Sequence, residues 1–138
     1  MARVPPEPTF PPADLAAIGA APTVRIETRG GPAAPVHRTV IRVVVDGGEV
    51  FVRSVRGPRG RWYRELLVWP DGALHVRRAS LAVRAIPAAD AASIERCSRA
   101  LEHKYAGDPA LGSMLRPETL PTTLRLVPDT ADAREDEG

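Results

Sequence analysis

The chain has 138 residues and a net charge of +2, which is the usual size of a single domain. No apolar run approaches the ~18 residues that a membrane-spanning helix requires, because arginines interrupt the hydrophobic stretches. Cys97 is the only cysteine, which excludes an internal disulfide and a metal site built from several cysteines. We therefore expect a soluble, cytoplasmic protein that does not bind membranes.

Both ends of the chain differ in composition from its middle. Residues 1–12 contain five prolines, which cannot join a β-ladder, so we predict an extended Pro-rich arm there. Residues 129–138 hold five acidic residues against Arg134, and we predict a disordered acidic tail. The rest of the chain then carries a net charge of +6. Residues 13–128 are predicted to form the folded domain.

The first half of the domain is predicted to form one short helix and three strands. Proline near its start and glycine at its end favour a helix over residues 12–19. Apolar and polar residues alternate over 24–28, which is typical of a half-buried strand. Two β-branched runs, 36–45 and 49–55, flank Asp-Gly-Gly at 46–48, and this pattern predicts a tight hairpin.

The second half adds two helices and three strands. An amphipathic helix is predicted over 61–69, and a second hairpin is predicted from strands 73–77 and 81–86. A longer helix is capped by Asp90 and ends at Gly107, and a last strand covers 122–127. Short strands, tight turns and inserted helices favour a mainly β domain, a six-stranded split β-barrel.

The most informative stretch is residues 53–64, where five arginines lie within twelve positions. Arginine pairs with phosphate oxygens through two parallel hydrogen bonds, and Gly57 and Gly60 let the backbone approach an anion closely. A helix that begins near Arg61 directs its free N–H groups at the same point, and Ser54 adds a hydroxyl. The stretch therefore predicts a phosphate-binding loop. The alternative is a solvated basic loop with no ligand.

Trp62 offers a flat face for a ring system, although its spacing with Leu66 also assigns it to the core. Arg38 and Thr39 lie on the neighbouring hairpin strand, where Arg38 either serves a ligand or faces solvent. Known patterns of catalytic residues are missing, so we assign no catalytic residue and no metal ligand. The histidines are scattered and match no metal-binding spacing: His37, His75 and His103.

The segments together resemble an uncharacterised bacterial family, a domain of unknown function numbered 2255. The resemblance runs roughly from residue 13 to 128. Its most specific part is the stretch R-S-x-R-G-x-x-G-R-W-Y-R at 53–64, and the hairpin at Asp46-Gly47 and the closing segment 123–128 also match.

More distantly, the layout resembles the deazaflavin-dependent nitroreductases and the flavin-binding split-barrel proteins. This resemblance implies a flavin-reductase-like split barrel with a bound FMN or deazaflavin. The chain departs from their pattern at Glu65, where those proteins have asparagine, and at Val40 and Ile41. Carried over by position, the resemblance implies these cofactor-binding residues: Arg38, Thr39, Arg53, Ser54, Arg56, Gly57, Arg61 and Trp62.

Three functions follow from these observations. The first is a flavin- or deazaflavin-dependent reductase of unknown substrate, in which the arginines of 53–64 hold the cofactor phosphate. The second is a cofactor-free barrel that binds a small ligand or a partner. The third is a nucleic-acid-binding module, which the modest net charge and the acidic tail disfavour. The resemblance leaves a single chain and a homodimer both open.

Overall fold

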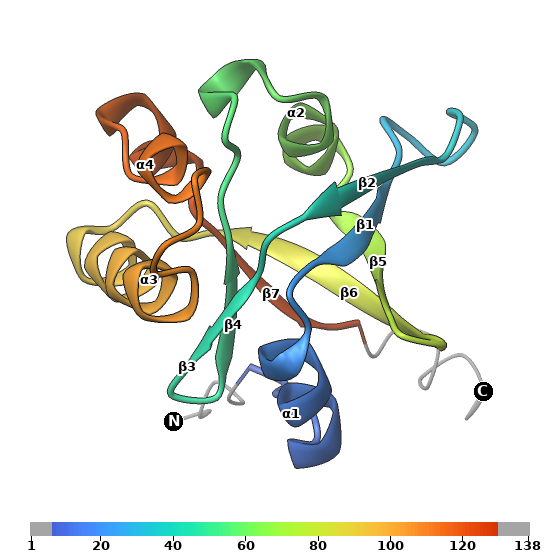
Figure 1. The fold of residues 1–138 in the computed structure, drawn as a ribbon. Coiled ribbons are helices and arrows are strands. Elements are labelled where there is room, and N and C mark those ends of the chain that lie inside the picture. Colours follow the sequence, from blue (N-terminus) through green and yellow to red (C-terminus); the bar gives the residue numbers. More distant parts are fainter. Residues whose placement is uncertain (1–6, 130–138) are drawn as a thin grey trace, which may run out of the picture.

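The computed structural model describes residues 7–129. The strands form one antiparallel sheet in the order β2-β1-β5-β6-β7-β4-β3. The sheet is curved, and β3 continues the course of β2, so the two ends of the strand order adjoin in the chain (Figure 1). The strands are β1 (Val24–Thr28), β2 (His37–Ile41), β3 (Val44–Asp46), β4 (Glu49–Val52), β5 (Asp71–Val76), β6 (Ala79–Pro87) and β7 (Leu124–Pro128).

Helices lie around the curved sheet rather than in a separate layer (Figure 1). The α-helices are α1 (Pro12–Ala20), α2 (Arg61–Val68), α3 (Ala91–Lys104) and α4 (Leu111–Met114). Two 3₁₀ helices, η1 (Gly57–Arg59) and η2 (Pro117–Thr122), complete the described chain. The three predicted helices are confirmed, whereas α4 and η2 occupy a segment for which the sequence predicted no element. Between residues 7 and 129, no helix combines the length and the apolar content that crossing a membrane requires.

The sheet has seven strands, so the prediction of six is wrong. The predicted strand 36–45 is divided at Val43, whose backbone leaves the ladder to bond with the end of α3. The Val43 N–H donates to the Tyr105 hydroxyl at 3.1 Å, and the Val43 carbonyl accepts from Lys104 Nζ at 2.7 Å. Because these groups are satisfied by side chains, the strand bends there, and β2 and β3 are separate strands.

The hairpin between β3 and β4 is confirmed, with the turn that the sequence predicted. Asp46 and Glu49 are the last paired residues, and Gly47 and Gly48 form the turn between them. Their φ angles are +57° and +80°. A two-residue turn with positive φ at both positions matches the right-handed twist of the strands, and glycine adopts it without strain.

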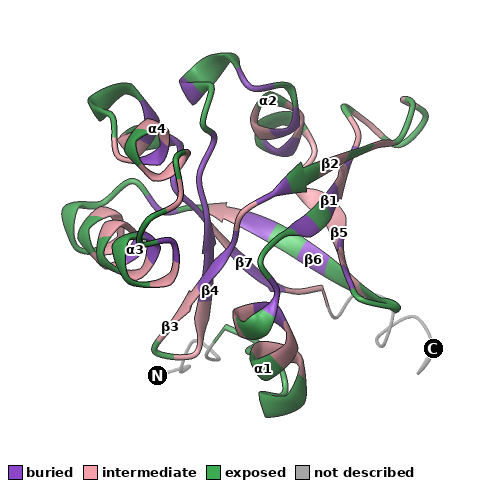
Figure 2. Ribbon diagram, viewed as in Figure 1, coloured by how far each residue is buried: buried purple, intermediate pink, exposed green. Residues whose placement is uncertain are grey.

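Strand β4 is buried on both of its faces (Figure 2). Val50 and Val52 face the interior of the curved sheet, where Ile26 and Leu74 also pack. Phe51 points the other way, into a second cluster beneath α3. That cluster consists of Val44, Phe51, Ala88, Cys97, Leu101, Tyr105 and Met114. Because side chains alternate along a strand, Arg53, two positions after Phe51, also points toward α3 and not toward the barrel interior.

The N-terminal arm packs on the domain in the part that the structure describes. Phe10 is buried in the main core, and Glu7 forms an ion pair with Arg125 of β7. The predicted extended arm therefore contributes Phe10 to the core, whereas residues 7–9 are exposed. Residues 1–6 of the arm and 130–138 of the predicted acidic tail lie outside the described residues.

The bend at Val43 generates a stability prediction. Tyr105→Phe removes the hydroxyl that accepts from the Val43 N–H and donates to the Pro22 carbonyl at 2.8 Å. The buried N–H is then unsatisfied, so we expect a loss of about 1–3 kcal/mol in the free energy of unfolding, measured by urea denaturation. Tyr63→Phe is the matched control, and an equal loss in both variants would contradict the role given to Tyr105.

Candidate functional site

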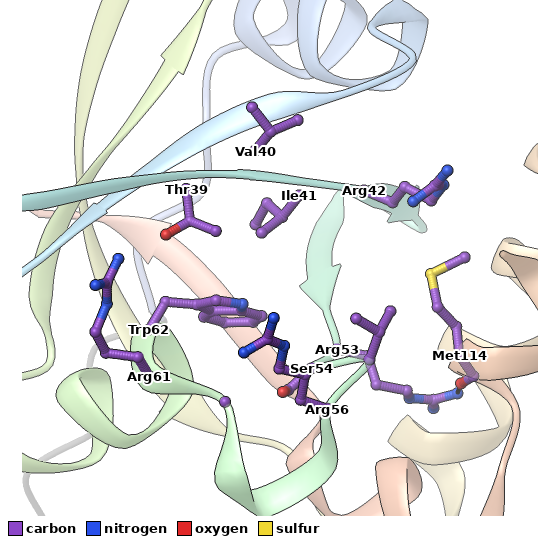
Figure 3. Close-up of a pocket in the computed structure, with 12 residues that line it drawn as sticks. Thr39, Val40, Ile41, Arg42, Arg53, Ser54, Arg56, Arg61, Trp62 and Met114 are labelled. Carbon is purple, nitrogen blue, oxygen red and sulfur yellow. Dashed lines mark hydrogen bonds between the residues drawn. The ribbon is translucent and has the colours of Figure 1, made fainter.

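A cavity of about 550 Å³ opens between β2, the loop after β4 and the start of α2 (Figure 3). Its apolar lining residues come from β2, α2, α4 and the loop after β4, and its polar lining includes four arginines. No aspartate or glutamate is among the residues that line it. The complete lining is Thr39, Val40, Ile41, Arg42, Arg53, Ser54, Val55, Arg56, Gly60, Arg61, Trp62 and Met114.

Two arginines of the cavity wall have uncommitted guanidinium groups. Within residues 7–129, neither Arg56 nor Arg61 has a hydrogen-bond or ion-pair partner on its side chain. The Trp62 indole lies between them, with Arg61 on one side and Arg56 on the other (Figure 3). An unpaired cation in a wall that lacks carboxylates produces a positive potential, which favours anionic ligands.

The first turn of α2 adds backbone donors to this wall. Gly60 and Trp62 both line the cavity, and the helix begins between them without a side-chain cap. The free N–H groups of an uncapped first turn and the helix dipole both favour an anion. Residue 60 must be glycine, because a Cβ there would lie 2.3 Å from Ser54 Oγ.

Arg53 is placed differently, and each nitrogen of its guanidinium donates a hydrogen bond inside the protein. Its side chain extends toward Met114 (Figure 3), and the residue is only 4% exposed. All of its partners are neutral, and burial lowers the pKa of the guanidinium. The donors reach Thr123 Oγ1 (3.0 Å), Ser98 Oγ (2.9 Å), the Met114 carbonyl (3.1 Å) and the Ile94 carbonyl (3.0 Å).

Ser54 and Gly57 shape the loop from within. The Ser54 hydroxyl donates to the Gly57 carbonyl at 2.8 Å, and its backbone N–H donates to Thr122 Oγ1 at 3.0 Å. Gly57 has a φ of +64° and lies outside the cavity lining. These contacts hold the turn that carries Arg56.

The two predicted site residues of β2, Arg38 and Thr39, lie on opposite faces of the strand. Thr39 and Ile41 lie on the same face of the strand and line the cavity. The side chain of Arg38 lies on the opposite face, where its Nε donates to Glu27 Oε1 at 3.0 Å, and it is not part of the lining. Two of the predicted residues, Arg38 and Gly57, therefore lie outside the cavity lining. The structure gathers the other six around one cavity: Thr39, Arg53, Ser54, Arg56, Arg61 and Trp62.

Two lining residues were not singled out by the sequence. Arg42 lies in the bend between β2 and β3 and pairs with Asp108 at 2.9 Å. Met114 comes from α4 and is 1% exposed. Neither carried a signal, because the sequence predicted a continuous strand through 42 and no element around 114.

The model of the bacterial family described as "Uncharacterized protein conserved in bacteria (DUF2255)" matches residues 14–126. The chain belongs to this family. The match covers the folded domain, including the arginine-rich loop and every element from α1 to β7 except their outermost residues. No curated protein matches this member of the family.

Several solved structures resemble this family member in fold. The heme storage protein HutZ from Vibrio cholerae is 13% identical, with 88% of this chain and 91% of that chain covered and a TM-score of 0.65. A Listeria innocua protein provisionally assigned as a pyridoxamine 5′-phosphate oxidase is 14% identical, with coverages of 85% and 91% and a TM-score of 0.60. An F420-H2 dependent reductase is 14% identical, with coverages of 76% and 93% and a TM-score of 0.58.

At these identities the likeness establishes the fold alone. The DUF2255 chain is a mainly β half-barrel sheet with helices, and it resembles the flavin-reductase-like folds. The function of the cavity has to be argued from the residues that surround it.

The buried position of Arg53 generates a second prediction. Arg53→Lys keeps the positive charge but loses the planar fork that reaches four acceptors. We expect a loss of about 1.5–3 kcal/mol in the free energy of unfolding, measured by urea denaturation. Arg56→Lys, on the exposed part of the same loop, is the control and should unfold like the unmodified protein. A normal stability of Arg53→Lys would be inconsistent with the bonding described.

Cys97, on the buried face of α3, generates a third prediction. The thiol is completely buried, and this burial raises its pKa from 9.0 to about 11. The neutral thiol is therefore favoured in the folded state, and its contribution to stability is complete below pH 9 and is lost as pH rises toward 11. We expect an aromatic disulfide reagent to label Cys97 in urea but not in the native protein at pH 8. Rapid native labelling would contradict this placement.

Proposed function

We propose that this protein binds FMN or a deazaflavin in the cavity beside Trp62 and acts as an oxidoreductase. The observation that carries the proposal is the pair of uncommitted guanidinium groups, Arg56 and Arg61, on either side of an indole in a wall without carboxylates. A phosphate with an attached ring system is the ligand chemistry that such a wall fits best.

The phosphate end of the ligand is supported by three kinds of donor. Arg56 and Arg61 offer charge-assisted hydrogen bonds, and the uncapped first turn of α2 offers backbone N–H groups. Glycine at position 60 lets the start of α2 pack closely against Ser54, since a Cβ there would lie 2.3 Å from Ser54 Oγ. Because the lining lacks acidic residues, a phosphate would meet no like charge.

The ring end is supported by the apolar part of the same cavity. Trp62, Ile41 and Val55 are lining residues from α2, β2 and the loop after β4. A volume of about 550 Å³ lies within the range of ~300–1,000 Å³ that is usual for small-molecule sites. The cavity therefore combines an apolar surface with a few polar groups, as cofactor sites do.

The proposal assigns different roles to the residues that the resemblance implied. Thr39, Arg56, Arg61 and Trp62 are proposed to contact the ligand. Arg53, Ser54 and Gly57 are proposed to hold the loop through the bonds described above. Arg38 has no proposed role in binding. Flavins and deazaflavins supply hydride transfer when bound, and the protein binds them, orients them and excludes water.

Titration with FMN and with a deazaflavin, followed by the quenching of cofactor fluorescence, tests the proposal. We expect Arg56→Ala to weaken binding about 10- to 100-fold, because it removes a charge-assisted hydrogen bond of ~1.5–3 kcal/mol. Arg59→Ala is the matched control, since Arg59 lies three positions further along the same loop, is exposed and does not line the cavity.

Two results would contradict the proposal. The first is the absence of binding of both cofactors to the unmodified protein. The second is an equal weakening by Arg56→Ala and Arg59→Ala, which would indicate a general attraction of anions to the basic loop. Salt-sensitive binding of oligonucleotides in place of cofactor would favour the nucleic-acid-binding function instead.

A further inference from the structure

A carboxylate–imidazole pair lies beyond the lining residues Thr39 of β2 and Arg61 of α2, and it has no role in the binding described so far. Thr28 of β1 and His37 of β2 are directly opposite each other in the sheet. Glu65 of α2 lies over both. His37 Nδ1 is 2.9 Å from Glu65 Oε2, and Thr28 Oγ1 donates to Glu65 Oε1 at 2.7 Å.

The hydrogen bonds determine which nitrogen of His37 is available. An ionised carboxylate only accepts hydrogen bonds, so the nitrogen that faces Glu65 carries the hydrogen. Nδ1–H is therefore fixed, and Nε2 is the nitrogen left for other chemistry. Among the residues that the structure describes, Nε2 has no hydrogen-bond partner. About a third of the His37 side chain is exposed, whereas Glu65 is 15% exposed and Thr28 is buried.

The pair lies on the same two elements as the ligand-contacting residues, next to the cavity, although neither His37 nor Glu65 is part of its lining. His37 precedes Thr39 by two positions on the same face of β2, a separation of about 7 Å along a strand. Glu65 follows Arg61 by four positions on α2, one turn of the helix. His37 and Glu65 therefore lie one step further along β2 and α2 than Thr39 and Arg61 do.

We propose that His37 transfers a proton to and from a ligand bound in the cavity, and that Glu65 is its positioning residue. This inference rests on the proposed function, because that function supplies the ligand. In the forward direction the Nε2–H bond of the imidazolium breaks and the proton forms a new bond to an oxygen or nitrogen of the ligand. The electron pair stays on Nε2, and Nδ1–H stays bonded to Glu65. Solvent returns the proton to Nε2.

A second carboxylate–imidazole pair in the protein provides an internal comparison. His75 of β5 contacts Glu27 of β1 at 3.0 Å, but through its Nε2. Glu27 alternates with Ile26 and Thr28 and so lies on the opposite face of β1, away from the cavity. Both pairs join a histidine to a glutamate, but they differ in the nitrogen used, in the face of the sheet and in the second donor to the carboxylate, which is Arg38 for Glu27 and Thr28 for Glu65.

Nitrogen NMR of the ¹⁵N-histidine-labelled full chain at mildly alkaline pH tests the inference in two steps. In the free protein, His37 should be the Nδ1–H tautomer and His75 the Nε2–H tautomer. Glu65→Gln should convert His37 into a mixture of tautomers, whereas Glu27→Gln should affect His75 alone. An unaltered backbone spectrum elsewhere shows that each variant is folded.

The second step adds FMN or a deazaflavin to saturation. The Nε2 resonance of His37 should shift with the same Kd as the fluorescence quenching, while His75 and His103 stay in place. A salt bridge that merely fastened α2 to β2 would leave Nε2 unmoved. Binding that depends on Arg56 but leaves Nε2 unmoved overturns the inference and preserves the proposed function. The absence of any binding overturns both.

Discussion

The guanidinium of Arg53 is the contact on which the cavity depends. It joins the end of β4 to α3, α4 and the start of β7, and it does so without a carboxylate partner. A buried cation is tolerated only when its donors are satisfied, and here carbonyl and hydroxyl oxygens satisfy them. Because these bonds fix the loop after β4, Arg56 and Arg61 are displayed at its surface. Arg53 thus stabilises the loop, whereas Arg56 and Arg61 are free to bind a ligand.

The parts of the fold that local sequence determines were predictable. Two glycines with positive φ define the hairpin turn between β3 and β4, and the spacing of Trp62 and Leu66 defines α2. The order of parts in the arginine-rich loop was also predictable, namely a strand, a glycine-containing turn and a helix start. Each of these depends on residues within a few positions of one another, where propensity and pattern are informative.

The features that were not predictable depend on residues distant in the chain. The division of β2 from β3 requires Lys104 and Tyr105, which come 61 and 62 positions after Val43. The burial of Arg53 could be foreseen only as alternation with Phe51, since α3 had first to be placed over that face of β4. His37 and Glu65 are 28 positions apart and match no motif, so only the pairing of β1 with β2 beneath α2 brings them together.

The helix α3 contributes no residue to the cavity lining, but it holds two parts of the cavity wall in place. Ile94 and Ser98 of α3 accept hydrogen bonds from Arg53, and Lys104 and Tyr105 at the end of the helix bond to Val43, next to Arg42. The loop after β4 and the bend between β2 and β3, which form two walls of the cavity, are therefore both held by α3. A shift of α3 along its axis would move both contacts together, so substitutions on the outer surface of α3 are a route by which the cavity could adapt to a ligand of different size while its lining residues stay the same.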